Sequence, residues 1–201
     1  MRADDNKVTW TAALTEDVFR YIGAYPIYFR TVAVIEEGQI QSMTWIMHKE
    51  SIAQLEAAGH KTIARRVLEE AWNQGNLDTV DELFAAETVY HDPDHGDITG
   101  RAAVKELINE FRTAFPDLQF TIEQQMVEGE VVATRWQATG THQGEYRGVA
   151  PTGKSITLSG VTLFQVTAVS RVEERQIVES WSYWNGLGLL VQLGVATDGS
   201  Q

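Results

Sequence analysis

Residues 130–167 read EVVATRWQATGTHQGEYRGVAPTGKSITLSGVTLFQVT, and this stretch decides the fold. In 130–140 and 155–167 apolar and polar side chains alternate, which is the period of a β-strand with one buried face. The glycine-bearing segment between them predicts a long loop. Segments 118–127 and 176–185 show the same period and are rich in Val, Ile, Thr, Phe and Trp. We therefore expect four successive strands that form an antiparallel meander.

The sequence before residue 117 has the period of helices instead. KTIARRVLEEAWNQ (61–74) places its apolar residues on one helical face, and LDTVDELF (77–84) continues the pattern after a Gly-Asn break. A third helix ends at Pro116, and GLGLLVQLG (186–194) closes the chain as a short helix. Helices followed by a meander predict the α+β class, with the helices packed on one face of a bent sheet.

The first 59 residues resemble the last part of the same chain. KVTWTAALT (7–15) is similar to residues 131–141, and KESIAQLEAAG (49–59) stands where residues 184–194 stand. Between these two segments, residues 19–45 resemble residues 146–181, with loops of different length. We interpret 1–59 as a partial repeat of three strands and a helix, followed by a complete domain over 60–201. Coincidence between two amphipathic meanders is the alternative.

A three-stranded fragment cannot bury its own hydrophobic face, so the N-terminal piece must dock on something. Two hypotheses remain open. The fragment packs against the sheet of its own chain, or it pairs with another copy across a two-fold axis.

Composition excludes several classes of function. The chain has 16 Lys and Arg against 28 Asp and Glu, a net charge of −12, so nucleic acid and membrane surfaces are poor partners. It has no cysteine, which removes disulfides and thiolate chemistry. The polar N-terminus does not suit a signal peptide, and no apolar run is long enough to span a membrane. We expect a soluble cytoplasmic protein.

Four motifs together resemble one known family. VYHDP (89–93), AFPDL (114–118), GTHQGEYRGVAPTGK (140–154) and IVESWSYWNGLGLLVQLG (177–194) occur in the order and spacing of the SnoaL-like polyketide and ester cyclases. The resemblance covers about residues 61–195. It implies a cone-shaped nuclear-transport-factor-2-like fold, in which a curved antiparallel sheet is wrapped around the N-terminal helices, with an enclosed cavity and a sheet-to-sheet homodimer. It also implies cofactor-free ring closure by acid–base chemistry.

Two histidines are candidates for that chemistry. His91 lies just after the second predicted helix, where the resemblance places the mouth of the cavity, and an imidazole can move a proton near neutral pH. A histidine that only fixes its loop is the alternative. His142 ends a predicted strand and shares a face with Trp136 by alternation, while Arg135 points the other way. A strand-end histidine in the wet loop is the alternative for His142.

The last predicted strand carries an unusual face. Glu179, Trp181, Tyr183 and Asn185 alternate, and this mixture of polar and aromatic groups is typical of a pocket wall. An exposed dimer interface is the alternative. The resemblance implies that the family has a catalytic Asp at the position of Asn185, and an amide cannot accept a proton. Either another group takes the proton, or the protein binds its ligand without turnover.

The candidate site therefore has two parts. The predicted catalytic residues are His91, His142, Glu179 and Asn185. The predicted substrate-binding residues are Trp72, Phe111, Met126, Trp136, Tyr146, Trp181 and Tyr183. The segment HDPDHGD (91–97) has turn chemistry rather than the spacing of a metal site, so we expect neither a metal nor a cofactor. The expected ligand is a small, apolar, oxygenated molecule.

Three functions remain open from the sequence. A cyclase or isomerase is favoured, a non-catalytic binding protein comes second, and a scaffold comes third. The first two differ in whether the cavity holds a group that can accept a proton.

Overall fold

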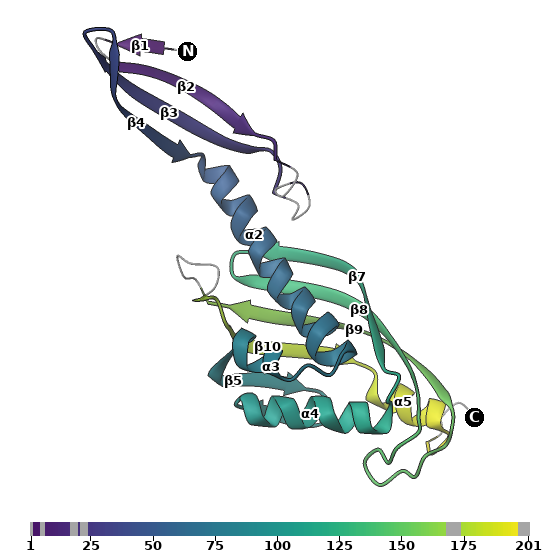
Figure 1. The fold of residues 1–201 in the computed structure, drawn as a ribbon. Helices are drawn as coiled ribbons and strands as arrows, with labels where there is room; N and C mark the ends of the chain where they lie inside the picture. Colours follow the sequence, from purple (N-terminus) through teal and green to yellow (C-terminus); the bar gives the residue numbers. More distant parts are fainter. Residues whose placement is uncertain (1, 5–6, 17–19, 21–23, 168–173, 197–201) are drawn as a thin grey trace. The chain divides into compact units, whose positions relative to one another are not determined.

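The computed structural model describes residues 2–4, 7–16, 20, 24–167 and 174–196 (Figure 1). The chain divides into two compact units, Met1–Gly59 and His60–Gln201, and each is described by itself. Residues 21–23, within the segment predicted to repeat 146–181, lie outside the described residues.

The second unit is built on a six-stranded sheet with the strand order β6-β5-β10-β9-β8-β7. Its strands are β5 (Phe84–Asp92), β6 (Gly96–Thr99), β7 (Gln119–Glu128), β8 (Val131–Thr141), β9 (Ser155–Val166) and β10 (Ile177–Trp184). The last four are the predicted meander, and they pair antiparallel. The sheet is mixed rather than wholly antiparallel, because β5 pairs with β10 in parallel.

Helices cover the inner face of this sheet (Figure 1). They are the second half of α2 (Lys49–Arg66), the π-helical turns of η1 (Val67–Asn73), α3 (Asp78–Leu83) and α4 (Arg101–Ala114), while α5 (Gly186–Leu193) closes one end. The helix η1 contacts β7, whereas α3 and α4 contact β5. The π-helical turns continue α2 and bury Leu68 and Trp72 toward the sheet. This arrangement is the predicted α+β architecture.

The inner face is set by strict alternation along β8. Val132, Thr134, Trp136 and Ala138 are buried, while Arg135 between them points outward and pairs with Glu123 at 2.9 Å. The outward direction is the one expected for Arg135. The buried side chains of β8, β9 and β10 join those of the helices in one continuous hydrophobic core.

The first unit is a four-stranded antiparallel sheet with the order β1-β2-β3-β4. Its strands are β1 (Arg2–Asp4), β2 (Lys7–Leu14), β3 (Ile27–Glu36) and β4 (Gln39–Met47), and the first half of α2 follows them. Its core is small: Ala24, Ile27 and Ala58, with Phe29, Met47 and Leu55 packed around them. The sequence predicts three strands and a helix here, and the structure has one strand more, β1, before them. No helix in the described part of the chain is both long and apolar enough to cross a membrane.

Candidate functional site

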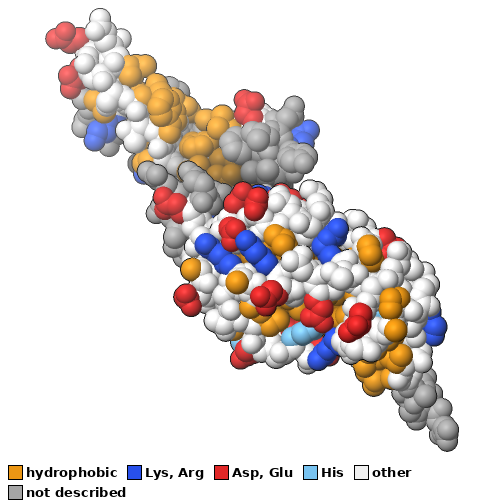
Figure 2. Space-filling view, turned by 60° about the horizontal axis from the view of Figure 1, so that its bottom comes forward, with side chains coloured by type: hydrophobic (Ala, Val, Ile, Leu, Met, Phe, Trp, Pro, Cys, Tyr) orange, Lys and Arg blue, Asp and Glu red, His pale blue; other side chains and the backbone are white. Residues whose placement is uncertain are grey.

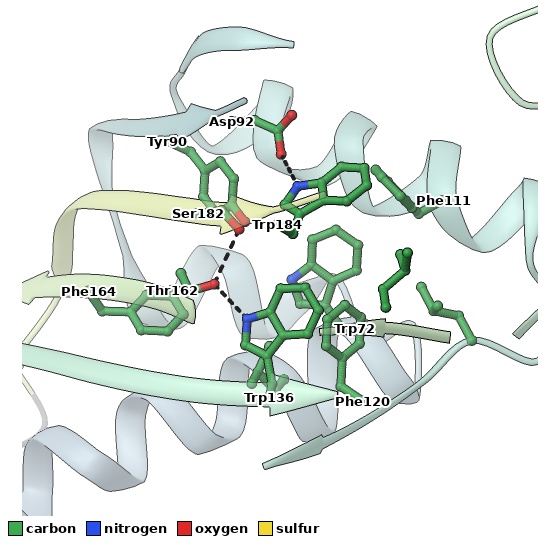
Figure 3. A pocket seen from close by; sticks show the side chains of 13 residues that line it. Trp72, Tyr90, Asp92, Phe111, Phe120, Trp136, Thr162, Phe164, Ser182 and Trp184 are labelled. Atoms are coloured by element: carbon green, nitrogen blue, oxygen red, sulfur yellow. Dashed lines mark hydrogen bonds between the residues drawn. The ribbon is translucent and has the colours of Figure 1, made fainter. Parts of the chain in front are cut away.

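The second unit holds a cavity between the inner face of its sheet and the covering helices (Figure 3). The cavity is narrow, with a volume of about 30 Å³, because its lining side chains fill most of the space between sheet and helices. Most of the lining is aromatic or aliphatic, and a few polar groups come from the strands. The lining residues are Leu68, Trp72, Tyr90, Asp92, Phe111, Leu118, Phe120, Trp136, Leu158, Thr162, Phe164, Ser182 and Trp184.

Aromatic rings in mutual contact form one wall. The ring of Trp72, from η1, lies 5.7 Å from that of Phe111 and 5.2 Å from that of Phe120. Phe120 in turn meets Trp136 edge to face at 4.9 Å, and Phe111 meets Trp184 at 5.9 Å. Such a wall suits the faces and edges of a flat apolar molecule.

Hydroxyl groups gather beside this aromatic wall. The indole N–H of Trp136 donates to Thr162 Oγ1 at 3.0 Å, and that oxygen lies 3.3 Å from Ser182 Oγ. The hydroxyl of Tyr90 joins both Thr162 and Ser182, and burial raises the pKa of Tyr90 well above its ordinary value. Tyr90 therefore stays protonated and can donate a hydrogen bond to an oxygen atom in the cavity.

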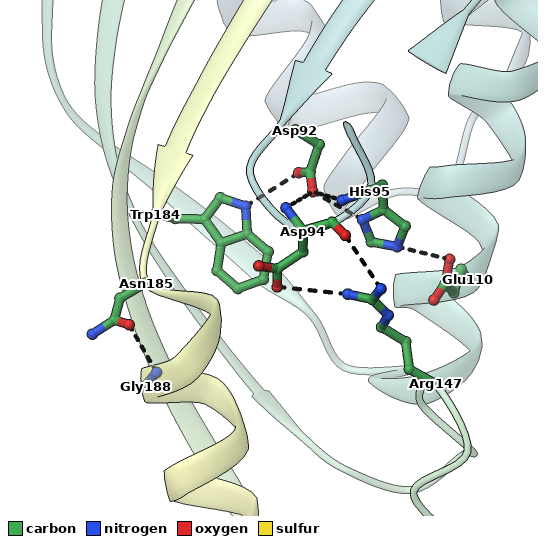
Figure 4. Close-up of polar contacts among 8 residues, drawn as sticks. All are labelled: Asp92, Asp94, His95, Glu110, Arg147, Trp184, Asn185 and Gly188. Carbon is green, nitrogen blue, oxygen red and sulfur yellow. Dashed lines mark hydrogen bonds and ion pairs between the residues drawn. The ribbon is translucent and has the colours of Figure 1, made fainter. Parts of the chain in front are cut away.

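Asp92 brings a carboxylate to the cavity at the end of β5 (Figure 4). Its side chain is only 3% exposed. Oδ1 accepts hydrogen bonds from the backbone N–H groups of Asp94 and His95 at 2.9 and 3.0 Å, and from His95 Nδ1 at 2.9 Å. Oδ2 accepts from Trp184 Nε1 at 3.2 Å. Among the described residues that line the cavity, Asp92 is the only ionisable carboxylate.

Further charged side chains surround the turn that Asp92 holds. The ring of His95 lies between two carboxylates, because its Nε2 is 3.2 Å from Glu110 Oε2 on α4. Arg147 donates to the backbone oxygen of Asp94 at 3.2 Å. Since the Nδ1 atom of His95 faces an oxygen that has no hydrogen when ionised, Nδ1 carries a proton and donates it. His95 thus holds the Asp92 carboxylate in one orientation.

Comparisons with known proteins identify the family of the chain. The sequence model described as SnoaL-like polyketide cyclase matches residues 62–193. The chain belongs to this family.

Solved structures give the same result. AclR from Streptomyces galilaeus, a proposed hydroxylase, is 30% identical with a TM-score of 0.60, over 72% of this chain and 91% of that one. IdmH from Streptomyces antibioticus, a proposed polyketide cyclase, is 30% identical with a TM-score of 0.56, over 68% and 99%. A protein of ketosteroid isomerase-like fold from Catenulispora acidiphila, 21% identical with a TM-score of 0.55 over 69% and 97%, shares the fold. No curated protein matches the chain. The predicted family and the cone-shaped nuclear-transport-factor-2-like fold are confirmed.

Three of the predicted substrate-binding residues line the cavity of this SnoaL-like domain. Trp72, Phe111 and Trp136 come from η1, α4 and β8, and all three are at least nine-tenths buried. Their contact with a ligand remains a prediction.

The predicted pocket face of β10 is the outer face, and this expectation is corrected. Ser182 and Trp184 line the cavity, whereas the lining includes neither Glu179, Trp181 nor Tyr183, whose side chain is 59% exposed. The physical reason is a β-bulge between Ile177 and Glu179, which reverses the phase of the alternation.

His91 lies on the same outer face and does not line the cavity. Its Nε2 is 2.9 Å from Glu179 Oε1, its Nδ1 is 2.6 Å from Asp97 Oδ1, and its ring stacks on Trp181 at 5.4 Å. These two carboxylates, Glu179 foremost, raise the pKa of His91. The outward direction follows from β5 itself, because Tyr90 and Asp92 on either side of His91 point inward.

Asn185 and Met126 also lie away from the cavity. Asn185 is exposed and caps α5, since its Oδ1 accepts from the N–H of Gly188 at 2.8 Å (Figure 4). Met126 is 59% exposed on β7. A carboxylate at position 185 would therefore cap the same helix and would not act on a molecule in this cavity.

His142 and Tyr146 are buried but lie beside the cavity rather than in its lining. The Nδ1 atom of His142 accepts from the N–H of Thr152 at 3.2 Å, and its ring packs on Phe115 at 5.2 Å. Burial lowers the pKa of His142, so the imidazole is neutral. Tyr146 packs on Phe111 at 5.2 Å. Both residues fix the loop between β8 and β9 against α4 and the turn after it.

Sequence reasoning missed Tyr90, Asp92, Thr162, Ser182 and Trp184. For the first two a signal was present, because period two in VYHDP puts Tyr90 and Asp92 on one face and His91 on the other. The turn prediction for HDPDHGD was right, since Asp92 caps the turn. In the described part of the chain, no three His, Asp or Glu side chains converge as metal ligands would.

Proposed function

We propose that this protein catalyses a cofactor-free cyclisation or isomerisation of a polyketide-like or ester substrate, with Asp92 as the group that accepts and returns the proton. The observation that carries the proposal is the place of Asp92: a buried carboxylate at the edge of an otherwise aromatic cavity. Neither of the predicted imidazoles and neither Glu179 nor Asn185 reaches this space. We therefore assign the proton transfer to Asp92 in place of these four predicted residues.

The Asp92 carboxylate and the nearby hydroxyl groups suit the two requirements of such a reaction, a base and a hydrogen-bond donor. Asp92 Oδ2 removes a proton from a carbon next to a carbonyl group, and the hydroxyl cluster of Tyr90, Thr162 and Ser182 donates to the developing enolate oxygen. For ring closure, the enolate carbon then bonds to a second carbonyl carbon of the same molecule, and the proton returns to the new alkoxide. For isomerisation, the proton returns to a different carbon.

Substitution of Asp92 tests the assignment. Asp92→Asn keeps the shape, and its one amide oxygen can still accept from the N–H groups of Asp94 and His95, but it removes the basic group, so turnover should fall by about 10²-fold or more. Asp97→Asn is the matched control, because Asp97 is 71% exposed and bonds His91 on the outer face. The measurement is product formation, by mass spectrometry, from a panel of linear polyketide mimics and hydroxy esters. Full activity of Asp92→Asn on a substrate that the wild type converts would refute the assignment.

Binding without turnover is the second candidate function. It is favoured by the four hydrogen bonds that already engage Asp92, as expected of a carboxylate that holds a turn. Trp72, Trp136 and Trp184 line the cavity, so a bound ligand should quench their fluorescence. Saturable quenching by a ligand that is recovered chemically unchanged, together with no product from any member of the panel, would favour a carrier or sensor over an enzyme.

We further infer that the domain forms the homodimer that the resemblance implies, through the outer face of its sheet. Support comes from the exposed aromatic and apolar groups found there, of which Tyr183 and Met126 are each 59% exposed. Exposed apolar groups of this size on one sheet face are typical of contact surfaces. The mass of residues 60–201 in solution tests this inference.

A further inference from the structure

The first unit reproduces the cavity wall of the second in strand register. In the second unit Trp136, Gly160 and Trp184 stand side by side on β8, β9 and β10. In the first unit Trp10, Thr31 and Trp45 stand side by side on β2, β3 and β4. Each row has a smaller residue on its middle strand and a tryptophan on each of the two neighbouring strands.

Other features of the two sheets match as well. The order β1-β2-β3-β4 has the antiparallel pairing of β7-β8-β9-β10, and in both units a helix follows the last strand. The N–H of Tyr28, on β3, donates to Ser51 Oγ in the following helix at 2.9 Å. The N–H of Thr157, on β9, donates to Gln192 Oε1 in its following helix at 2.8 Å. The two sheets thus agree in strand order and pairing, although the row matches Trp45 with Trp184, whereas the sequence match of 19–45 with 146–181 sets Trp45 against Trp181.

In the first unit this wall is covered along its middle strand, where Ile27, Thr31 and Ala33 are at most 1% exposed, and it is exposed on β4. Trp136 is 4% exposed beneath η1 and α4, whereas Trp45 is 64% exposed. The first part of α2 packs on one end of the face only, where Leu55 and Ala58 meet Ile27. Figure 2 shows hydrophobic side chains gathered on the surface of this unit. In the described residues, the helical layer that should close the wall is missing.

The open face is uncharged, whereas the opposite face of the same sheet is not. Paired residues on neighbouring strands share a face, so alternation assigns the two sides. The open face carries Val8, Trp10, Ala12, Leu14, Ile27, Phe29, Thr31, Ala33, Met43, Trp45 and Met47. The opposite face carries Lys7, Arg30 and Glu36. Among the described residues of the open face, none is charged.

We propose that a second copy of this chain covers the open face, sheet against sheet, about a two-fold axis. Two chains of net charge −12 repel each other, so they can meet closely only through a surface free of charge, and this face supplies one. The one helical layer in the described part of the chain already covers its own sheet. Identical apolar faces are self-complementary across a two-fold axis, and two sheets pack about 10 Å apart.

The strength of self-association tests the proposal. The full chain should associate more tightly than residues 60–201, which have their own core and any dimer contact of the second sheet. Trp45→Lys should weaken this extra association by at least about tenfold. Ile46→Lys is the matched control: Ile46 is 42% exposed on the opposite face of the same strand, and its change should leave the association intact. Analytical ultracentrifugation gives the masses, and circular dichroism checks folding.

Crosslinking tests the same contact without removing a tryptophan. The chain has no cysteine, so single cysteines are unambiguous reporters. Met43→Cys, on the open face, should crosslink two copies with a short bis-maleimide, whereas Ser42→Cys on the opposite face should not. Equal crosslinking of the two cysteines, or unchanged association of Trp45→Lys, would overturn the proposal. Either result would mean that the face is covered within its own chain or by another partner.

Discussion

The face of the strand on which a side chain lies decides whether it can reach the cavity, and His91 is an example. Its ring looks like a proton carrier at a cavity mouth, yet it lies between Glu179 and Asp97 on the outside of the sheet. The residue that enters the cavity is its neighbour Asp92. One position along a strand separates a side chain in the site from an ion pair on the surface.

This outer ion pair predicts a pH dependence of stability. Folding raises the pKa of His91, mainly through Glu179 and then Asp97. Its contribution is therefore complete below the unfolded pKa of about 6.5 and disappears as the pH rises through the folded value. In urea unfolding, the wild type should exceed His91→Gln in stability by more at about pH 5.5 than at about pH 8.5. The same difference at both values would mean that the imidazolium makes no net interaction in the fold.

At the scale of elements, the strands and helices follow from the sequence. Period two located β7 to β10 to within a residue or two, and period 3.6 located η1, α3 and α4. Alternation shows which residues of a strand share a face, but it does not show which of the two faces points inward. In β10 a bulge decides this. Counted from buried Ile177, Glu179 and Trp181 should point inward, but the bulge after Ile177 turns Ser180 and Ser182 inward instead. No local pattern in IVESW marks that bulge, so the inner wall needed the structure.

Periodicity could not predict the parallel pairing of β5 with β10 either. It joins segments about ninety residues apart, and it brings Asp92 next to the end of the last strand, where Trp184 donates to it. Sequence spacing alone carries no information on such a long-range pair. The catalytic candidates changed for this reason, while the fold did not.

The position of Asn185 at the end of β10 predicts how its substitution changes stability and activity. Because Asn185 caps α5, Asn185→Ala should lower the free energy of unfolding by about 1 kcal/mol. Asn185→Asp keeps a capping oxygen and should change that free energy by less than about 0.5 kcal/mol, with no gain of turnover. Urea unfolding and the substrate panel measure the two effects. Leu187→Ala is the control, since Leu187 is 58% exposed on the same helix. New cyclase activity in Asn185→Asp would return this position to the site.

At the scale of the whole molecule, the chain contains one complete domain and one open sheet with a similar wall. The two units have separate cores, one continuous and one limited to a few side chains around Ile27. A small core of this kind supplies little stability, so the first unit depends on whatever covers its face. The complete domain does not share that dependence.

Separate cores predict separate unfolding. Residues 60–201 alone should melt within about 2 °C of the main transition of the full chain, because their core is separate from that of the first unit. The full chain should show an additional, earlier transition that rises with protein concentration, since a second copy covers the open face. Differential scanning calorimetry at several concentrations measures both. A main transition that falls by several degrees on truncation would show that the first sheet supports its own domain, because lost contacts within one chain lower its melting temperature at every concentration.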